Sequence, residues 1–337
     1  MKKIIPGLLL SLAIAIIATM LNQYVHLIGA SVFALLLGMF INFFMKDTKK
    51  YKDGITFTSK KLLKVAIVLL GTSLSVSQII HVGKYSLVVM VFTLAAAFGF
   101  GYFIGKIFNM NWKLSSLISA GTGICGGTAV ATLSQVIDAD DSDVAYAISA
   151  TFIFDVIMVI LFPIMGTALG LSDMAFGLWA GTAVNDTSSV VAAGYAYSDA
   201  AGDFATMVKL TRTLSIIPTV IVFAFIQLGI KKKELKGNGE DGNLKANFSI
   251  AKIFPWFILG FLAMAIVASI FPVPAQVVSA TKKASKFLMV CALAAIGLNT
   301  SFSGLKKSGI RPMIHGFIIS ALVVVVALLV EIGMGIV

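Results

Sequence analysis

Long apolar stretches separated by short polar segments run through the whole chain. A helix needs about 20 mostly apolar residues to cross the hydrocarbon core of a bilayer, and eleven stretches approach that length. Lipid cannot satisfy free backbone polar groups, so the stretches predict helices, and none alternates like a β-barrel strand. The predicted spans are residues 5–22, 28–45, 61–80, 85–106, 114–136, 144–168, 174–196, 204–229, 252–271, 285–304 and 311–334. The pattern predicts an all-α polytopic membrane protein with about 11 transmembrane helices.

Composition excludes an ordinary soluble domain. Of the 337 residues, 58% are hydrophobic and 12% are charged, whereas about a quarter of a soluble domain is charged. We expect one transmembrane domain, residues 1–337, with a polar linker at about 231–250 and no separate soluble domain. The formal charge of +11 comes from lysines in short loops rather than from a basic stripe, so nucleic acid is not an expected partner.

Charged loops suggest an orientation, because lysine and arginine favour the cytoplasmic side. With the N-terminus inside, the lysine-rich connections are cytoplasmic and two acidic connections are external. The lysine-rich connections are Lys46–Lys52, Lys106–Lys113 and Lys231–Lys236, and the acidic ones are Asp138–Asp143 and Ser198–Asp203. This predicts an extracytoplasmic C-terminus, with the fifth and seventh spans running parallel.

Two lysine clusters share one pattern. Ser59-Lys60-Lys61-x-x-Lys64 matches Thr281-Lys282-Lys283-x-x-Lys286 at a distance of 222 residues. A second set of matches follows at a distance of 226 residues: Gly71, Ser75, Ser77 and Gly83 correspond to Gly297, Ser301, Ser303 and Gly309. The predicted topology turns the two copies in opposite directions. Inverted repeats with discontinuous helices are typical of secondary transporters.

The fifth span is rich in glycine. Its candidate substrate-binding residues are Gly121, Thr122, Gly123, Cys125, Gly126, Gly127 and Thr128. The segment fits G-x-G-x-x-G, but a dinucleotide site needs a preceding strand, which is absent from the pattern. Four glycines within seven residues weaken a helix, and a half-helix starting near Thr128 would direct its positive end at an anion. The alternative is a glycine-lined packing groove.

Polar residues also lie deep in neighbouring spans. The seventh span contains Asn185, Asp186, Thr187 and Ser188, the sixth contains Asp155, the eighth contains Lys209 and Arg212, and the tenth contains Asn299 and Thr300. Ionisable residues at such depth usually face a cavity or a partner. In one interpretation Arg212 clamps an anion and an aspartate carries a coupling proton or cation. In the other, the two aspartates simply pair with Lys209 and Arg212.

These motifs carry a family resemblance. The runs GTGICGGTA and AGTAVNDTSSVVAAGYA and the KLTR run at Lys209–Arg212 resemble YeiH-type bacterial inner-membrane proteins, a family named for sulfate export. The similarity extends over nearly the whole chain. It implies an 11-helix protein with broken crossing helices, distantly similar to bile-acid and sodium/proton transporters, that moves its substrate by an elevator-like shift. Sulfate, with sulfite and organosulfonates as related candidates, is the implied substrate.

We therefore expect a secondary transporter that exports a small inorganic anion, by resemblance a sulfur oxyanion, coupled to protons or sodium. A cation/proton antiporter using Asn185 and Asp186 and a non-transporting scaffold or sensor remain open alternatives. No Ser-His-Asp set, phosphate loop or metal-ligand cluster fits its context, so we expect no enzyme activity, metal or cofactor. The expected partners are the anion, the bilayer and, as one option, a second copy in a homodimer.

Overall fold

The computed structural model describes residues 4–24, 29–45, 49–237, 255–271, 273–299 and 309–337, and this part of the chain is helical with no strand. Five of its helical segments are long and apolar enough to cross a membrane. They are Ile5–Gln23, Val76–Ile107, Ser142–Ala168, Asp199–Ile230 and Ile310–Gly333. The expectation of an all-α membrane protein is confirmed at this level, whereas the count of eleven crossings is not.

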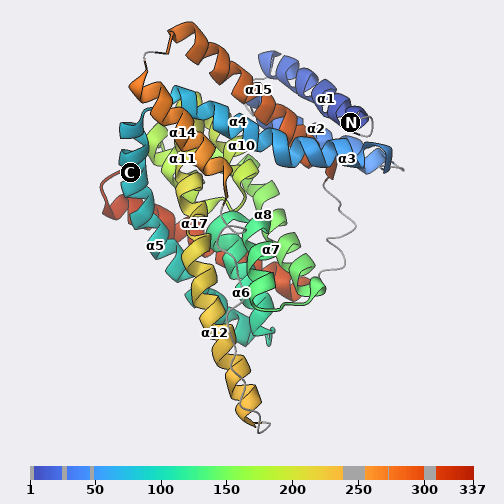
Figure 1. Cartoon of the computed structure of the whole chain (residues 1–337), viewed down its shortest axis with the longest axis vertical. Coiled ribbons are helices and arrows are strands. Elements are labelled where there is room, and N and C mark those ends of the chain that lie inside the picture. The colour runs from blue at the N-terminus through green and yellow to red at the C-terminus, as the bar shows by residue number, and fades with distance from the viewer. Residues whose placement is uncertain (1–3, 25–28, 46–48, 238–254, 272, 300–308) are drawn as a thin grey trace.

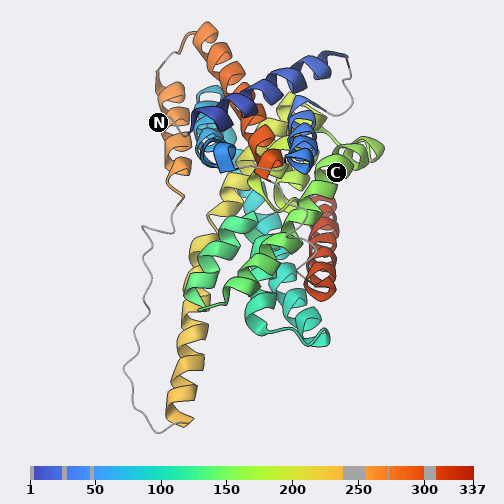
Figure 2. The ribbon, with the colours of Figure 1, turned by 90° about the vertical axis from the view of Figure 1, so that its right-hand side faces the viewer.

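The helices form two groups (Figure 1; Figure 2). The scaffold group, at the top of both views, comprises α1 (Ile5–Tyr24), α2 (Gly29–Phe44), α3 (Lys49–Phe57), α4 (Leu63–Leu70), α14 (Phe257–Ile270) and α15 (Ala275–Asn299). The hairpin group comprises α5 (Val76–Ile107), α6 (Trp112–Ala120), α7 (Gly127–Val136), α8 (Asp141–Ala168), α9 (Asp173–Ala183), α10 (Thr187–Tyr197), α11 (Asp199–Thr213), α12 (Ile216–Gly237) and α17 (Ile310–Gly333).

The predicted third span, 61–80, is interrupted. Helix α4 ends at Leu70 and α5 begins at Val76. Ser75 starts the new helix through a capping box, in which its side chain accepts from the Gln78 N–H and the Gln78 side chain accepts from the Ser75 N–H. Because residues 61–80 are mostly apolar, their hydropathy does not reveal that a new helix starts at Ser75.

Helices α6 and α7 form a re-entrant hairpin, hairpin 1 (residues 111–138). The Lys113 ammonium donates to the Asp138 carbonyl at 2.6 Å, and the Asn111 amide donates to the Asp143 carboxylate at 3.5 Å. The two ends of the hairpin therefore lie on the same face of the protein. Its tip turns at Gly126, whose φ of 63° favours glycine. The prediction that the fifth span crosses the membrane is wrong.

Helices α9 and α10 form a second hairpin, hairpin 2 (residues 172–198). The rings of Phe176 and Tyr197 stack with centroids 3.9 Å apart, and the Ser198 hydroxyl donates to Asp173 at 2.6 Å. Each helix has 11 residues, a length of about 16 Å, or roughly half of the hydrocarbon core. The seventh predicted span therefore enters and leaves on one face as well.

The two hairpins enter from opposite faces. Helix α8 has 28 residues and spans about 42 Å, from the base of hairpin 1 to the base of hairpin 2. We name these sides the hairpin 1 face and the hairpin 2 face. Lys106–Lys113 and Asp138–Asp143 consequently share the hairpin 1 face, which corrects their predicted separation. Ser198–Asp203 lies on the hairpin 2 face, and the hairpins are not parallel.

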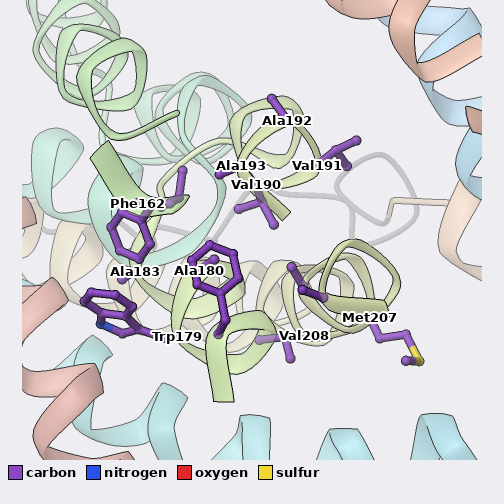
Figure 3. Packing of buried hydrophobic residues seen from close by; sticks show 14 of the residues in the cluster. Phe162, Trp179, Ala180, Ala183, Val190, Val191, Ala192, Ala193, Met207 and Val208 are labelled. Atoms are coloured by element: carbon purple, nitrogen blue, oxygen red, sulfur yellow. The ribbon is translucent and has the colours of Figure 1, made fainter. Parts of the chain in front are cut away.

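Close packing fixes hairpin 2 between α8 and α11 (Figure 3). The Phe162 and Trp179 rings lie 4.4 Å apart, and Ala180, Ala183 and Val208 are at most slightly exposed. A Cβ atom at Gly181 would lie 2.7 Å from the Ala205 carbonyl oxygen, so glycine is required where α9 approaches α11. The position of the tip follows from this packing.

The two lysine clusters lie on helices that pack together. The Thr72 and Thr281 hydroxyls are 2.7 Å apart, and the Ser285 hydroxyl donates to the Ala66 carbonyl at 2.6 Å. Residue numbers rise along one helix as they fall along the other, so the two segments are antiparallel. Ser301 and Ser303 lie outside the described residues, and the inverted repeat stays a prediction.

The hairpins give a testable side assignment. In a Cys125→Ser/Cys291→Ser background, Lys106→Cys and Ser142→Cys should react with a membrane-impermeant maleimide from the same side of sealed vesicles. Leu169→Cys and Ala200→Cys should react from the other side. An eleven-crossing topology instead separates positions 106 and 142, so labelling of these two from opposite sides would refute hairpin 1.

Candidate functional site

The tips of the two hairpins meet inside the protein. A Cβ atom at Gly126 would lie 3.1 Å from the Asp186 Cβ and 3.2 Å from its Oδ1. Gly126 separates α6 and its terminal π-helical turn, Gly121–Cys125, from α7, and residues 184–186 separate α9 from α10. The break expected in the fifth span is therefore observed, the break at residues 184–186 was not expected, and the two breaks are in contact.

Two cations bind the carbonyl ends of the first half-helices. The Lys209 ammonium donates to the carbonyls of Ile124 and Val184, both at 2.9 Å, and so joins the two tips. Arg212 donates through Nε to the Gly123 carbonyl and through Nη2 to the Thr122 carbonyl, both at 2.7 Å. Both side chains are 0% exposed. Positive charge is favourable at these ends, where the helix dipole is negative.

Two carboxylates bind the amide end at the break of hairpin 2. Asp155 on α8 accepts from the N–H of Asn185 at 2.8 Å and from the N–H of Asp186 at 3.0 Å. Asp186 caps α10 by accepting from the Ser188 N–H at 2.9 Å, and it also accepts from the Ser188 hydroxyl. Negative charge stabilises a helix N-terminus.

The four charges thus satisfy broken backbone rather than one another. Within the described residues, no ion pair joins Asp155 or Asp186 to Lys209 or Arg212. The interpretation of direct pairing is therefore wrong. Its physical reason is that the breaks expose carbonyls and N–H groups, which cannot remain unpaired in a water-poor interior.

A cavity of about 820 Å³ lies between the two groups of helices. It runs from the tip residues Asp186–Ser188 along α7 to Gln135, near the base of hairpin 1, so it extends toward the hairpin 1 face. The scaffold side of the wall is formed by Ser59, Lys60, Leu63, Lys64, Ile67, Phe257, Ile296 and Asn299.

The N-terminus of α7 lies at this wall without a side-chain cap. Gly127 and Thr128 are the lining residues there, and the first N–H groups of a helix have no intrahelical partner. Across the cavity, Lys60 and Lys64 are exposed and form no ion pair with a described carboxylate. A helix N-terminus and two ammonium groups together favour an anion.

The expected site residues fall into two sets. Those that line the cavity are Gly127, Thr128, Asp155, Asp186, Thr187, Ser188 and Asn299. Those buried outside its lining are Gly121, Thr122, Gly123, Cys125, Gly126, Asn185, Lys209 and Arg212. Thr300 lies outside the described residues. Arg212 therefore holds the tip of hairpin 1 and does not reach the cavity as an anion clamp would.

Sequence reasoning found Asn299 in the scaffold wall of the cavity but missed the other residues of that wall. Lys60 and Lys64 were singled out as part of a repeat, but their spacing of four residues also places them on one helix face. That spacing, read together with polar residues in the fifth span, was the available signal. The opposite wall contains Thr132, Gln135 and Ser149, and apart from their polarity no sequence signal marks them as cavity residues.

A helical fold with membrane-crossing segments and two re-entrant hairpins defines a multi-pass membrane protein. The chain belongs to the UPF0324 family of membrane proteins, since the family described as conserved hypothetical protein 698 matches residues 6–316. A UPF0324 membrane protein of Clostridium tetani is 57% identical over 340 residues, covering 99% of this chain and 98% of the relative. One from Streptococcus pyogenes serotype M18 is 42% identical, covering 98% of both. The family is consistent with the resemblance to YeiH-type proteins.

The bridge at Lys209 predicts a loss of stability when it is removed. Lys209→Met leaves two buried carbonyls without their charged donor and should lower the detergent melting temperature by about 5–10 °C. The exposed Lys232 provides the control, because Lys232→Met should change the temperature little. Equal melting temperatures for both variants would show that the bridge does not hold the tips.

Proposed function

We propose that this protein is a secondary transporter of a small inorganic anion. The observation that carries the proposal is the uncapped N-terminus of α7 in a cavity that also contains Lys60 and Lys64. Backbone N–H groups, a favourable helix dipole and ammonium groups are the features that bind compact oxyanions. A sulfur oxyanion such as sulfate or sulfite presents several acceptor oxygens to such a site, and the family resemblance supports this choice.

The two hairpins suggest how the anion would move. Their tips are tied together by Lys209, so hairpins 1 and 2 form one unit that carries the site. The scaffold group supplies the other wall of the cavity. In the proposed elevator-like mechanism the unit slides along the scaffold and transfers the cavity from one membrane face to the other.

Asp186 at the tip of hairpin 2 and Asp155 on α8 beside it supply the proposed coupling site. Asp186 is only partly buried and lines the cavity together with Asp155. An anion that enters beside two carboxylates is favoured when a proton or a cation neutralises part of their charge. This arrangement supports coupling to a proton or to sodium.

The lysine-rich connections indicate which face of the protein is cytoplasmic. The segment Lys106–Lys113 belongs to the hairpin 1 face, which we assign to the cytoplasm of a bacterial inner membrane by the positive-inside rule. The cavity then has its access from the cytoplasm, as a transporter that exports its substrate requires at the start of its cycle.

A cation/proton antiporter is the second candidate, and Asp155 and Asp186 in the cavity wall favour it. Proteoliposomes separate the two candidates. Uptake of radiolabelled sulfite or sulfate supports the anion transporter. Proton movement driven by sodium or lithium, without anion flux, supports the antiporter.

The cavity lysines predict the effect of substitution on flux. Lys60→Gln and Lys64→Gln should each raise the apparent KM for the anion about three- to ten-fold, because each removes a positive charge facing the substrate. Lys61→Gln is the matched control, since Lys61 is exposed and lies outside the cavity lining. A KM unchanged in all three variants would contradict the proposed site.

Coupling should depend on the carboxylate of Asp186. Asp186→Asn keeps a side-chain acceptor for the Ser188 N–H but removes the titratable charge. We expect anion flux in this variant to lose its dependence on an imposed proton or sodium gradient. Full wild-type coupling in Asp186→Asn, measured in the same proteoliposomes, would exclude Asp186 from the coupling step.

A further inference from the structure

Ion pairs join the scaffold to the hairpin group on the hairpin 2 face. Lys282 and Lys286 of α15 lie 2.5 Å from the carboxylates of Asp203 and Asp199 of α11, respectively. These four residues bridge the same two groups of helices that enclose the cavity. The cavity, however, extends toward the opposite face.

Tyr195 of hairpin 2 organises these ion pairs. Its hydroxyl donates to the Oδ1 of Asp203 at 2.7 Å, while Lys282 binds Oδ2. The Lys286 ammonium lies 5.5 Å from the centre of the Tyr195 ring. The Asp203 side chain is 11% exposed and that of Asp199 is 73% exposed. Since water weakens exposed pairs, Lys282–Asp203 is the stronger contact.

The cavity lysines Lys60 and Lys64 form no such ion pair with a described carboxylate. Lys60 and Lys64 occupy the positions in their cluster that Lys282 and Lys286 occupy in theirs. Acidic residues follow each hairpin in the same way: Asp199 and Asp203 follow hairpin 2, while Asp140 begins the acidic run after hairpin 1. Asp140 is exposed, and so are Lys60 and Lys64, which face the cavity.

We propose that the twin lysine clusters form two gates that close alternately. The hairpin 2 gate consists of Lys282, Lys286, Asp199 and Asp203 with Tyr195, and it is closed in this structure. When the hairpin unit slides, these pairs separate, and Lys60 and Lys64 pair with Asp140. This proposal rests on the proposed transport function.

The hairpin 2 gate can be opened by neutralising its lysines. The reporter is Ala131→Cys, an exposed position on the cavity wall, in the Cys125→Ser/Cys291→Ser background. In Lys282→Gln/Lys286→Gln, labelling by an impermeant maleimide from the hairpin 2 face should become about five-fold faster than in the parent, because closing contacts are lost. Lys283→Gln is the matched control: Lys283 is exposed and forms no ion pair with a described carboxylate.

Two further variants complete the test. Asp203→Asn should also accelerate labelling from the hairpin 2 face, and it replaces the lysine variant if that variant elutes as aggregate. Asp140→Asn, which weakens the hairpin 1 gate, should slow that labelling when added to the open-gate variant. Rates from the hairpin 2 face that equal the parent's in folded Lys282→Gln/Lys286→Gln or Asp203→Asn would overturn the proposal. Unchanged labelling on adding Asp140→Asn would overturn its second gate.

The labelling experiment needs no substrate, so its result tests the gates separately from the transport proposal. Faster labelling without any anion flux would support the gate proposal and contradict the proposed anion substrate. Anion flux with unaltered labelling rates would support the transport proposal and contradict the gate proposal.

Discussion

Lys209 holds the two hairpin tips together through backbone carbonyls of both. Breaking a helix inside a membrane exposes backbone groups that lipid cannot satisfy. Here one ammonium group binds the carbonyl ends of both first half-helices, and Arg212 binds two further carbonyls of hairpin 1. Without these donors the hairpins could not meet at their tips, and the cavity would lack its inner end.

The same constraint separates structural charge from functional charge. Asp155 and Asp186 satisfy the amide end of hairpin 2, so the N-terminus of α10 is already neutralised. The N-terminus of α7 has no such cap and lies in the cavity opposite Lys60 and Lys64. The site is therefore positive where an anion would bind and negative beside it, and this asymmetry gives the proposed transporter both a substrate site and a coupling site.

Sequence patterns predicted the helices, a break near Gly126 and a cluster of deep polar residues, but not the break at Asn185–Asp186. They could not show that the fifth and seventh spans reverse direction, because a hairpin and a crossing helix need similar numbers of apolar residues. The polar caps that start each hairpin, Asn111 and Ser172, are short-range signals that hydropathy does not detect. The opposite charges of the aspartates and of Lys209 and Arg212 suggested direct ion pairs. These side chains bind instead the backbone groups that the helix breaks leave without partners. The lysine clusters were recognised as a repeat, but only the fold brings Lys60 and Lys64 to the cavity.

The central claim is that the N-terminus of α7 binds an oxyanion in the cavity. Anomalous diffraction from crystals soaked in selenate, a heavier analogue of sulfate, tests it most directly. We expect a selenium peak that places selenate oxygens within hydrogen-bond distance of the Gly127 or Thr128 N–H groups, and its loss in Lys60→Gln/Lys64→Gln crystals. A well-ordered cavity with no peak at this position, at a selenate concentration that saturates transport, would contradict the claim.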